Sequence, residues 1–281
     1  IGPVNDLTNF YEYQLYCKSL YASLQSFTKK TVARLRETSE QTIIETIKQK
    51  YKLIDRTSDY TFTIDSSTSK DFDDAFSIQP IENTNLHRIS IYIANVTIWL
   101  DVMNLWDSFS DRIATIYLPD RKRPMMPTIL SDCLCSLVEG NTRFAFTLDM
   151  IVNTHGKLIS HEFNNSIINV NKNHAYETPE LYETPQFKLL LDMTKRMNRT
   201  SKSIPKLKDS HHMVSFMMVL MNYVCAKELI TYKNGIFRSV KTNQQIQSNH
   251  SLPDNVVTFI TMWNSTAGVY VPYEEYDSHD T

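Results

Sequence analysis

The chain has 281 residues, a formal net charge of −2 and only five glycines, no two of which lie close enough to form a glycine-rich phosphate loop. This excludes nucleotide binding of the dinucleotide-fold or Walker type. Hydrophobic residues make up 42% of the chain, and its length is sufficient to bury a large core, so we expect a globular protein.

The cysteines and the apolar runs narrow the class of protein further. The cysteines are too few and too scattered for a disulfide framework or a four-thiolate zinc site: Cys17, Cys133, Cys135 and Cys225. A glycosylation motif at Asn95 falls within a strand-like run in which a glycan does not fit. The apolar runs are shorter than the ~20 residues of a membrane span, and the first residues lack the pattern of a targeting peptide. We therefore expect an intracellular, cytoplasmic protein that does not bind membranes.

The hydrophobic pattern changes from helical to extended along the first hundred residues. Up to residue 54, apolar residues such as Leu20, Leu24 and Phe27 recur at roughly helical spacing, which predicts helices. From Tyr60 to Trp99 the apolar residues are mainly β-branched and aromatic, which predicts three or four strands.

The remainder of the chain alternates between both kinds of element. We predict helices over 107–117 and 130–138, on either side of a proline-rich connection that is not regular structure. Strands over 143–152 and 157–170 flank a turn at 153–156, and helices follow over 187–196, 213–230 and 242–250. The pattern predicts one α+β domain.

A cluster of four acidic residues lies between two of the predicted strands. Asp65, Asp71, Asp73 and Asp74 fall within ten residues. Two carboxylates ~4 Å apart repel each other by about 4 kcal/mol at an effective dielectric constant near 20. A loop that brings them together must therefore bind a cation, protonate one carboxylate or keep them solvated. Oxygen ligands without Cys or His favour Mg²⁺ or Mn²⁺ over zinc.

Spacing alone leaves other interpretations of this cluster open. An acidic surface loop whose side chains point apart accounts for it equally well. An EF-hand calcium loop does not, because Ala75 and Phe76 occupy its fifth and sixth positions, and the sixth requires glycine.

The string from Thr63 to Ala75 resembles the active-site signature of the RNB family, the ribonuclease II and exosome-type exoribonucleases. Further segments resemble that family in order and spacing, from about Asp55 to the end of the chain. They are Tyr117–Pro127, Leu130–Leu137, Arg143–Thr147, Ser166–Ile168, Tyr176–Glu177, Met218, Asn222 and Gly235–Arg238. The resemblance implies an α+β fold with a mixed or antiparallel sheet surrounded by helices, in which residues 1–54 are a helical lead-in and residues 55–281 an RNB-like catalytic domain.

The resemblance also implies roles for individual residues. Asp65, Asp71 and Asp74 are similar to the family's metal-coordinating carboxylates, and Asp73 is similar to the aspartate most critical for turnover. Tyr117 matches the tyrosine that stacks on the last nucleotide at the RNA 3′ end, and stacking suits an enzyme that must accept every base. The remaining expected RNA contacts are Arg121, Arg123, Arg143 and Tyr176.

The activity implied is hydrolysis of single-stranded RNA from its 3′ end to nucleoside 5′-monophosphates, with Mg²⁺ or Mn²⁺ as cofactor. Because the net charge is −2, RNA binding depends on local basic patches, at Arg121–Arg123 and between Lys195 and Lys208. The family's Thr-Ser-Pro-Ile-Arg motif is expected beyond Thr281. Without it, an RNB-like module that binds RNA or a protein partner without catalysis is the alternative, and a structural fragment is a third possibility.

Overall fold

The computed structural model describes residues 6–20, 22–109, 114–201, 207–239 and 269–275. The chain divides into two compact units, residues 1–213 and 214–281. The predicted boundary after residue 54 stays a prediction.

The first unit is built on a closed barrel of five strands in the order β1-β2-β3-β6-β7. Their bounds are β1 (Leu53–Asp65), β2 (Asp74–Ile81), β3 (Leu86–Ala94), β6 (Thr142–Asn153) and β7 (Leu158–Ala175). Neighbouring strands are antiparallel except β1 and β7, which are parallel and close the barrel. The turn between β6 and β7 is held by hydrogen bonds from Gly156 N–H to Asn153 C=O and from Asn153 N–H to Lys157 C=O. The α+β class and the mixed sheet predicted from the sequence are confirmed.

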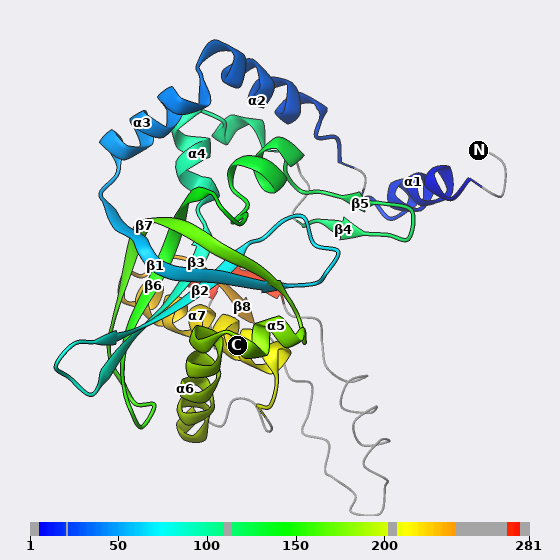
Figure 1. Ribbon diagram of the computed structural model, residues 1–281. Coiled ribbons are helices and arrows are strands. Elements are labelled where there is room, and N and C mark those ends of the chain that lie inside the picture. Colours follow the sequence, from blue (N-terminus) through cyan, green and yellow to red (C-terminus); the bar gives the residue numbers. More distant parts are fainter. Residues whose placement is uncertain (1–5, 21, 110–113, 202–206, 240–268, 276–281) are drawn as a thin grey trace, which may run out of the picture. The chain divides into compact units, whose positions relative to one another are not determined.

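Helices pack against one end of this barrel through a continuous apolar core (Figure 1). They include α2 (Gln25–Glu37), α3 (Glu40–Lys50), α4 (Val96–Val102) and the π-helical segment η2 (Ile129–Leu134). Phe27 of α2, Ile47 of α3 and Trp99 of α4 are buried in the same cluster as Phe144 of β6. The helical spacing of apolar residues in the first fifty positions thus reflects real helices with one buried side. The other helices of this unit are α1 (Leu7–Cys17), the short turn η1 (Trp106–Ser108), α5 (Pro179–Glu183) and α6 (Pro185–Ser201).

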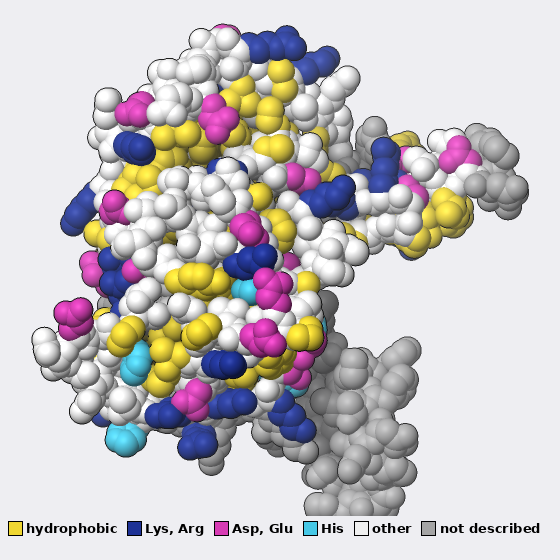
Figure 2. Space-filling view, viewed as in Figure 1, with side chains coloured by type: hydrophobic (Ala, Val, Ile, Leu, Met, Phe, Trp, Pro, Cys, Tyr) yellow, Lys and Arg dark blue, Asp and Glu magenta, His cyan; other side chains and the backbone are white. Residues whose placement is uncertain are grey.

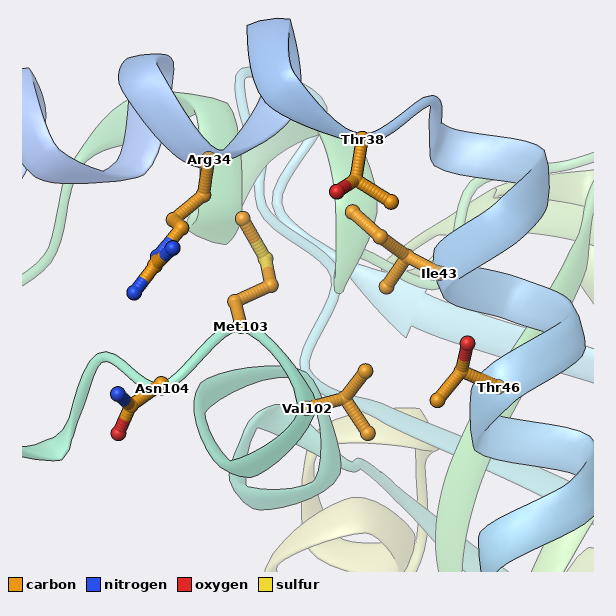
Figure 3. A pocket seen from close by; sticks show the side chains of 7 residues that line it. All are labelled: Arg34, Thr38, Ile43, Thr46, Val102, Met103 and Asn104. Atoms are coloured by element: carbon orange, nitrogen blue, oxygen red, sulfur yellow. The ribbon is translucent and has the colours of Figure 1, made fainter.

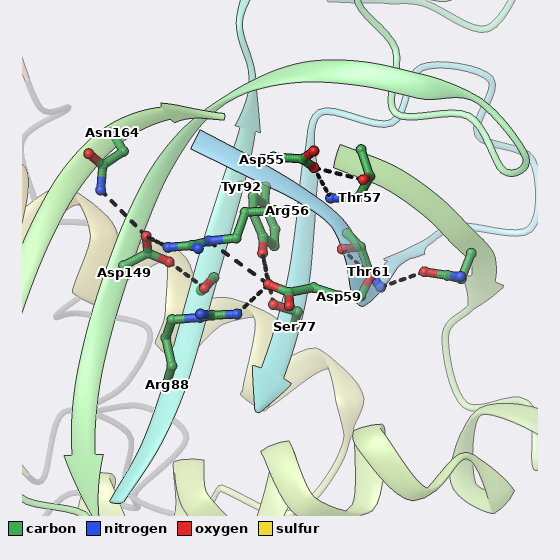
Figure 4. A network of polar contacts seen from close by, with 12 residues as sticks. Asp55, Arg56, Thr57, Asp59, Thr61, Ser77, Arg88, Tyr92, Asp149 and Asn164 are labelled. Atoms are coloured by element: carbon green, nitrogen blue, oxygen red, sulfur yellow. Dashed lines mark hydrogen bonds and ion pairs between the residues drawn. The ribbon is translucent and has the colours of Figure 1, made fainter. Parts of the chain in front are cut away.

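Two buried carboxylates connect the barrel strands through ion pairs (Figure 4). The Asp59 carboxylate accepts a hydrogen bond from Arg88 Nη2 at 2.5 Å. Asp149 accepts from Arg56 Nη2 at 2.8 Å and from Ser90 Oγ at 2.5 Å. Because each buried carboxylate has a guanidinium partner, the network joins β1, β3 and β6 without leaving a net charge inside the barrel.

Three local predictions are corrected by the structure. The strand expected to run through Trp99 ends at Ala94, and residues 96–102 form α4. Asn95, the residue before this helix, is buried and bonds through Nδ2 to Asn165 Oδ1 at 2.7 Å, and this contact turns the chain away from the sheet. The β-branched residues that follow suit a strand or a buried helix equally well, so their periodicity was misleading.

The other two corrections concern the two helices predicted within residues 107–138, and the connection between them also differs from its prediction. Within the described part of 107–117 the only helical residues belong to η1, and Ile116–Tyr117 is strand β4. The proline-rich connection contains the partner strand β5 (Lys122–Arg123), so it includes a short antiparallel ribbon. The helix predicted over 130–138 is η2, which ends at Leu134.

The second unit contains most of helix α7 (Ser210–Thr231), which begins in the first unit, and two paired strands, β8 (Ile236–Ser239) and β9 (Val269–Pro272), followed by the turn η3 (Tyr273–Glu275). By length and composition alone α7 could cross a membrane, a test that core helices of soluble proteins also pass. The sequence-based expectation that no apolar run reaches this length is therefore corrected. The helix predicted over 242–250 lies outside the described residues.

Candidate active site

The four aspartates lie on the loop that connects β1 to β2. Asp65 is the last residue of β1 and Asp74 the first of β2. The backbone N–H of Tyr176 donates to the C=O of Asp65 at 2.9 Å, and the N–H of Ala94 donates to the C=O of Asp73 at 2.8 Å. Both ends of the acidic loop are thereby fixed on neighbouring strands.

Phe72 anchors the middle of this loop between two of its acids. Its N–H donates to Ser136 Oγ at 2.9 Å, and its C=O accepts from the N–H of Leu137 at 2.9 Å. Arg143 in turn holds the Ser136 segment, because its Nε donates to the C=O of Ser136 at 2.7 Å and its Nη2 to the C=O of Cys133 at 3.0 Å. The sequence analysis expected Arg143 to contact RNA, whereas here its guanidinium supports the anchor of the acidic loop.

Burial and mutual repulsion raise the pKa of three of the aspartates. Burial, followed by the charges of Asp73 and Asp71, raises the pKa of Asp65 to about 6. Burial, followed by the charges of Asp65 and Asp73, raises the pKa of Asp74 to about 7. The pKa of Asp73 is also raised, mainly by burial and then by the charge of Asp71. The four carboxylates are therefore electrostatically coupled. That they form a cation site stays a prediction.

Two oxygens of the cluster are buried and accept no hydrogen bond from any described residue: Asp65 Oδ2 and Asp74 Oδ2. We call them the open oxygens. A buried carboxylate oxygen without a donor is unfavourable unless a cation or a proton occupies it. The donor set therefore fits a hard divalent cation bound by Asp65 and Asp74.

A fully assembled metal site is not present among the described residues, where no three His, Cys, Asp or Glu side chains are placed together to hold an ion. Asp71 is in an ion pair with a lysine instead. Lys122 Nζ lies 3.3 Å from Asp71 Oδ2 and 3.1 Å from Asp132 Oδ2. The sequence analysis assigned Lys122 only to a basic patch and missed Asp132, because their contact with the cluster depends on the β4–β5 ribbon and on η2.

The two predicted tyrosines both lie near the aspartates. Tyr117 pairs with Lys122 across the ribbon, and its ring is 71% exposed. Its cross-strand neighbour Lys122 contacts Asp71, so Tyr117 lies beside the cluster. Partial burial, followed by the charge of Asp71, raises the pKa of Tyr117. Tyr176 has its pKa raised to about 12 by burial and the charges of Asp74 and Asp65. Its ring stacks on that of His211, with centroids 3.8 Å apart and planes 8° apart. The sequence carried no signal for His211.

The two remaining predicted arginines make contacts within the protein. Arg123 is buried, and its guanidinium bonds to both carboxylate oxygens of Asp120, at 2.6 and 2.7 Å, and to Glu12. Arg121 Nη2 also bonds to Glu12, at 2.9 Å, although Arg121 stays largely exposed. These contacts attach α1 to the ribbon and leave Arg123 unsuited to bind phosphate.

One cavity among the described residues lies away from the aspartates. A hollow of about 290 Å³ lies between α2, α3 and the end of α4, with Arg34, Ile43 and Met103 in its lining (Figure 3). None of the four aspartates lines it. On the face shown in Figure 2, basic and acidic side chains are interspersed, in agreement with a net charge of −2.

Residues 54–181 match the model of the RNB domain. This segment of the chain is similar to the RNB domain. The matched residues include the whole acidic loop, Lys122, Asp132 and both site tyrosines.

Curated relatives match part of the chain. Ribonuclease R of Thermotoga maritima is 34% identical over 125 residues, which cover 44% of this chain and 18% of the relative. DIS3-like exonuclease 2 of Xenopus tropicalis is 32% identical over 108 residues, which cover 38% of this chain and 13% of the relative. The chain thus spans a fifth or less of the length of these two relatives.

Solved structures share the fold of the RNB domain. Mycoplasma genitalium RNase R in complex with double-stranded RNA aligns with a TM-score of 0.69 and 17% identity, covering 84% of this chain and 48% of that one. Yeast Ssd1, described as a pseudonuclease, aligns with a TM-score of 0.61 and 12% identity, covering 83% and 36%. At these identities the likeness shows the fold alone, and this fold is shared by a nuclease and a pseudonuclease.

Proposed function

We propose that this protein is a metal-dependent 3′-to-5′ exoribonuclease that hydrolyses single-stranded RNA to nucleoside 5′-monophosphates, with Mg²⁺ or Mn²⁺ as its cofactor. The observation that carries the proposal is the pair of open oxygens, which lie in a cluster of four carboxylates within the segment similar to the RNB domain. The similarity to ribonuclease R supports RNA as the substrate.

The residues at the site would have different roles in the reaction. Asp65, Asp71 and Asp74 would hold the metal, which when bound lowers the pKa of a water molecule and stabilises the leaving 3′ oxygen. Asp73 lies between two of these acids in the sequence, and its carboxylate would orient the attacking water. The exposed ring of Tyr117 provides a stacking surface for the terminal base, which suits all four bases.

A second candidate function is binding of RNA or of a protein without catalysis. The contact that favours it is the ion pair between Lys122 and Asp71, which occupies one of the proposed metal ligands. This fold also occurs in yeast Ssd1, which is described as a pseudonuclease.

Analysis of the products separates the two functions. The full chain is incubated with a 5′-labelled single-stranded RNA in Mg²⁺, in Mn²⁺ and in EDTA, and the products are separated by chromatography and on a sequencing gel. Exonuclease activity releases 5′-monophosphates with either metal and none in EDTA, and Asp73→Asn abolishes the release. The matched control is Asp192→Asn on α6, an exposed aspartate that pairs with Arg196. RNA that is retained but intact in both metals would support the second function.

A further inference from the structure

Lys122 places a positive charge inside the acidic cluster. Its ammonium nitrogen lies between Asp71 on the β1–β2 loop and Asp132 on η2, at 3.3 and 3.1 Å from their carboxylate oxygens. Figure 1 shows the β4–β5 ribbon that carries Lys122 beside this loop. The side chain is 26% exposed, so the contact is partly shielded from water.

Three features distinguish this contact from an ordinary surface ion pair. Lys122 has two carboxylate partners from different segments of the chain. One of them, Asp71, is a proposed metal ligand, whereas the open oxygens belong to Asp65 and Asp74. The ammonium therefore occupies Asp71, one of the three proposed metal ligands, and its charge repels a divalent cation.

We propose that Lys122 is a built-in cation that competes with the divalent metal for Asp71, so that metal binding requires exchange of the ammonium for the metal. The inference rests on one part of the proposed function, namely that the aspartates bind a metal. Since Lys122 pairs with Tyr117 across the ribbon, release of the ammonium takes place beside the proposed base-stacking residue.

Direct measurement of Mn²⁺ binding tests the competition without recourse to activity. Isothermal titration calorimetry is carried out on the full chain as wild type, Lys122→Met and Lys122→Arg. Removal of a like charge at ~4 Å should tighten Mn²⁺ binding about tenfold or more in Lys122→Met. Lys122→Arg retains the charge and should stay within about threefold of wild type. The matched control is Lys172→Met, because Lys172 also bridges two carboxylates, Glu139 and Glu180, which lie outside the cluster.

A second measurement uses the wild-type chain, so it does not depend on the folding of a variant. Acetic anhydride labels lysine amines, and mass spectrometry reports the extent of labelling at each lysine. Addition of Mg²⁺ should raise labelling of Lys122 by about threefold or more, because the amine loses its contact with Asp71, while labelling of Lys172 should not change.

Each outcome has a defined meaning. Tighter Mn²⁺ binding by Lys122→Met, or binding by this variant alone, supports the exchange. If wild type binds Mn²⁺ and Lys122→Met binds it equally or more weakly, and if Mg²⁺ leaves labelling of Lys122 unchanged, the exchange is overturned. The metal-dependent nuclease function is not affected by that result. No Mn²⁺ binding by any folded variant overturns both the exchange and the metal dependence in the proposed function.

Discussion

Replacement of Asp74 by asparagine should stabilise the metal-free protein, and the gain should grow with pH. Burial and the neighbouring carboxylates raise the pKa of Asp74 from its ordinary 3.8 to about 7. A carboxyl group with a raised pKa in the folded state favours folding only while it is protonated, so stability is lost as the pH rises from about 4 through about 7. Asparagine has the same shape and carries no charge, so this loss is absent from the variant.

The size of the effect follows from linkage. A shift of about three pKa units corresponds to about 4 kcal/mol of destabilisation at a pH well above 7. Between pH 5.5 and pH 8.5 the change amounts to about 2 kcal/mol, because part of the loss is already present at pH 5.5. This difference between two pH values is the quantity to test, since any loss of hydrogen bonding by the buried amide affects both equally.

Urea unfolding in EDTA at these two pH values measures the effect. The free energy of unfolding of Asp74→Asn, relative to wild type, should become more favourable by about 2 kcal/mol at the higher pH. Mg²⁺ should stabilise wild type at pH 8.5 and reduce the advantage of the variant. Asp192→Asn, an exposed aspartate outside the cluster, should show no such trend. If the difference in free energy of unfolding between Asp74→Asn and wild type is the same at both pH values, Asp74 is not buried at an energetic cost.

Three further predictions concern binding, stability and loop position. Tyr117→Ala should weaken single-stranded RNA binding by about 5- to 150-fold in fluorescence anisotropy, since stacking contributes ~1–3 kcal/mol per base, and Tyr117→Trp should restore it. Asp149→Leu should lower the free energy of unfolding by about 3 kcal/mol in urea, because it leaves the Arg56 guanidinium buried without its carboxylate. Ser136→Ala removes the acceptor of the Phe72 N–H and should cost about 1–2 kcal/mol, with faster amide exchange at Phe72 by NMR.

Controls define how each of these predictions fails. Equal RNA affinity in Tyr117→Ala and wild type would show that the exposed ring does not contact RNA. If Asp149→Leu is as stable as wild type, its pair with Arg56 does not hold the barrel strands together. If Ser136→Ala leaves amide exchange at Phe72 unchanged, Leu137 alone anchors the loop.

The sequence could indicate the acidic loop but not the contacts that complete it. Asp65 and Asp74 lie at strand ends, and the change in periodicity around them was sufficient to place them there. Lys122 and Asp132 are ten residues apart in an irregular segment, and they meet only because β4 pairs with β5 while η2 turns the chain back. For Arg123, which was predicted to contact RNA because it lies beside a site tyrosine, the structure adds ion pairs with Asp120 and Glu12 that the sequence did not indicate.

The way the acidic loop is held explains how it can be both ordered and reactive. Its position is set by backbone groups: the carbonyls of Asp65 and Asp73 accept hydrogen bonds from strand residues, and both backbone groups of Phe72 are bonded. These contacts use no carboxylate oxygen, so the loop can be fixed while the open oxygens remain available to a cation. A loop held instead by its acidic side chains would have to break those contacts to bind metal. The carboxylate of Asp65 has a side-chain hydrogen bond with Thr63, whereas that of Asp71 is in an ion pair with Lys122, and this ion pair is the point at which metal binding can be controlled.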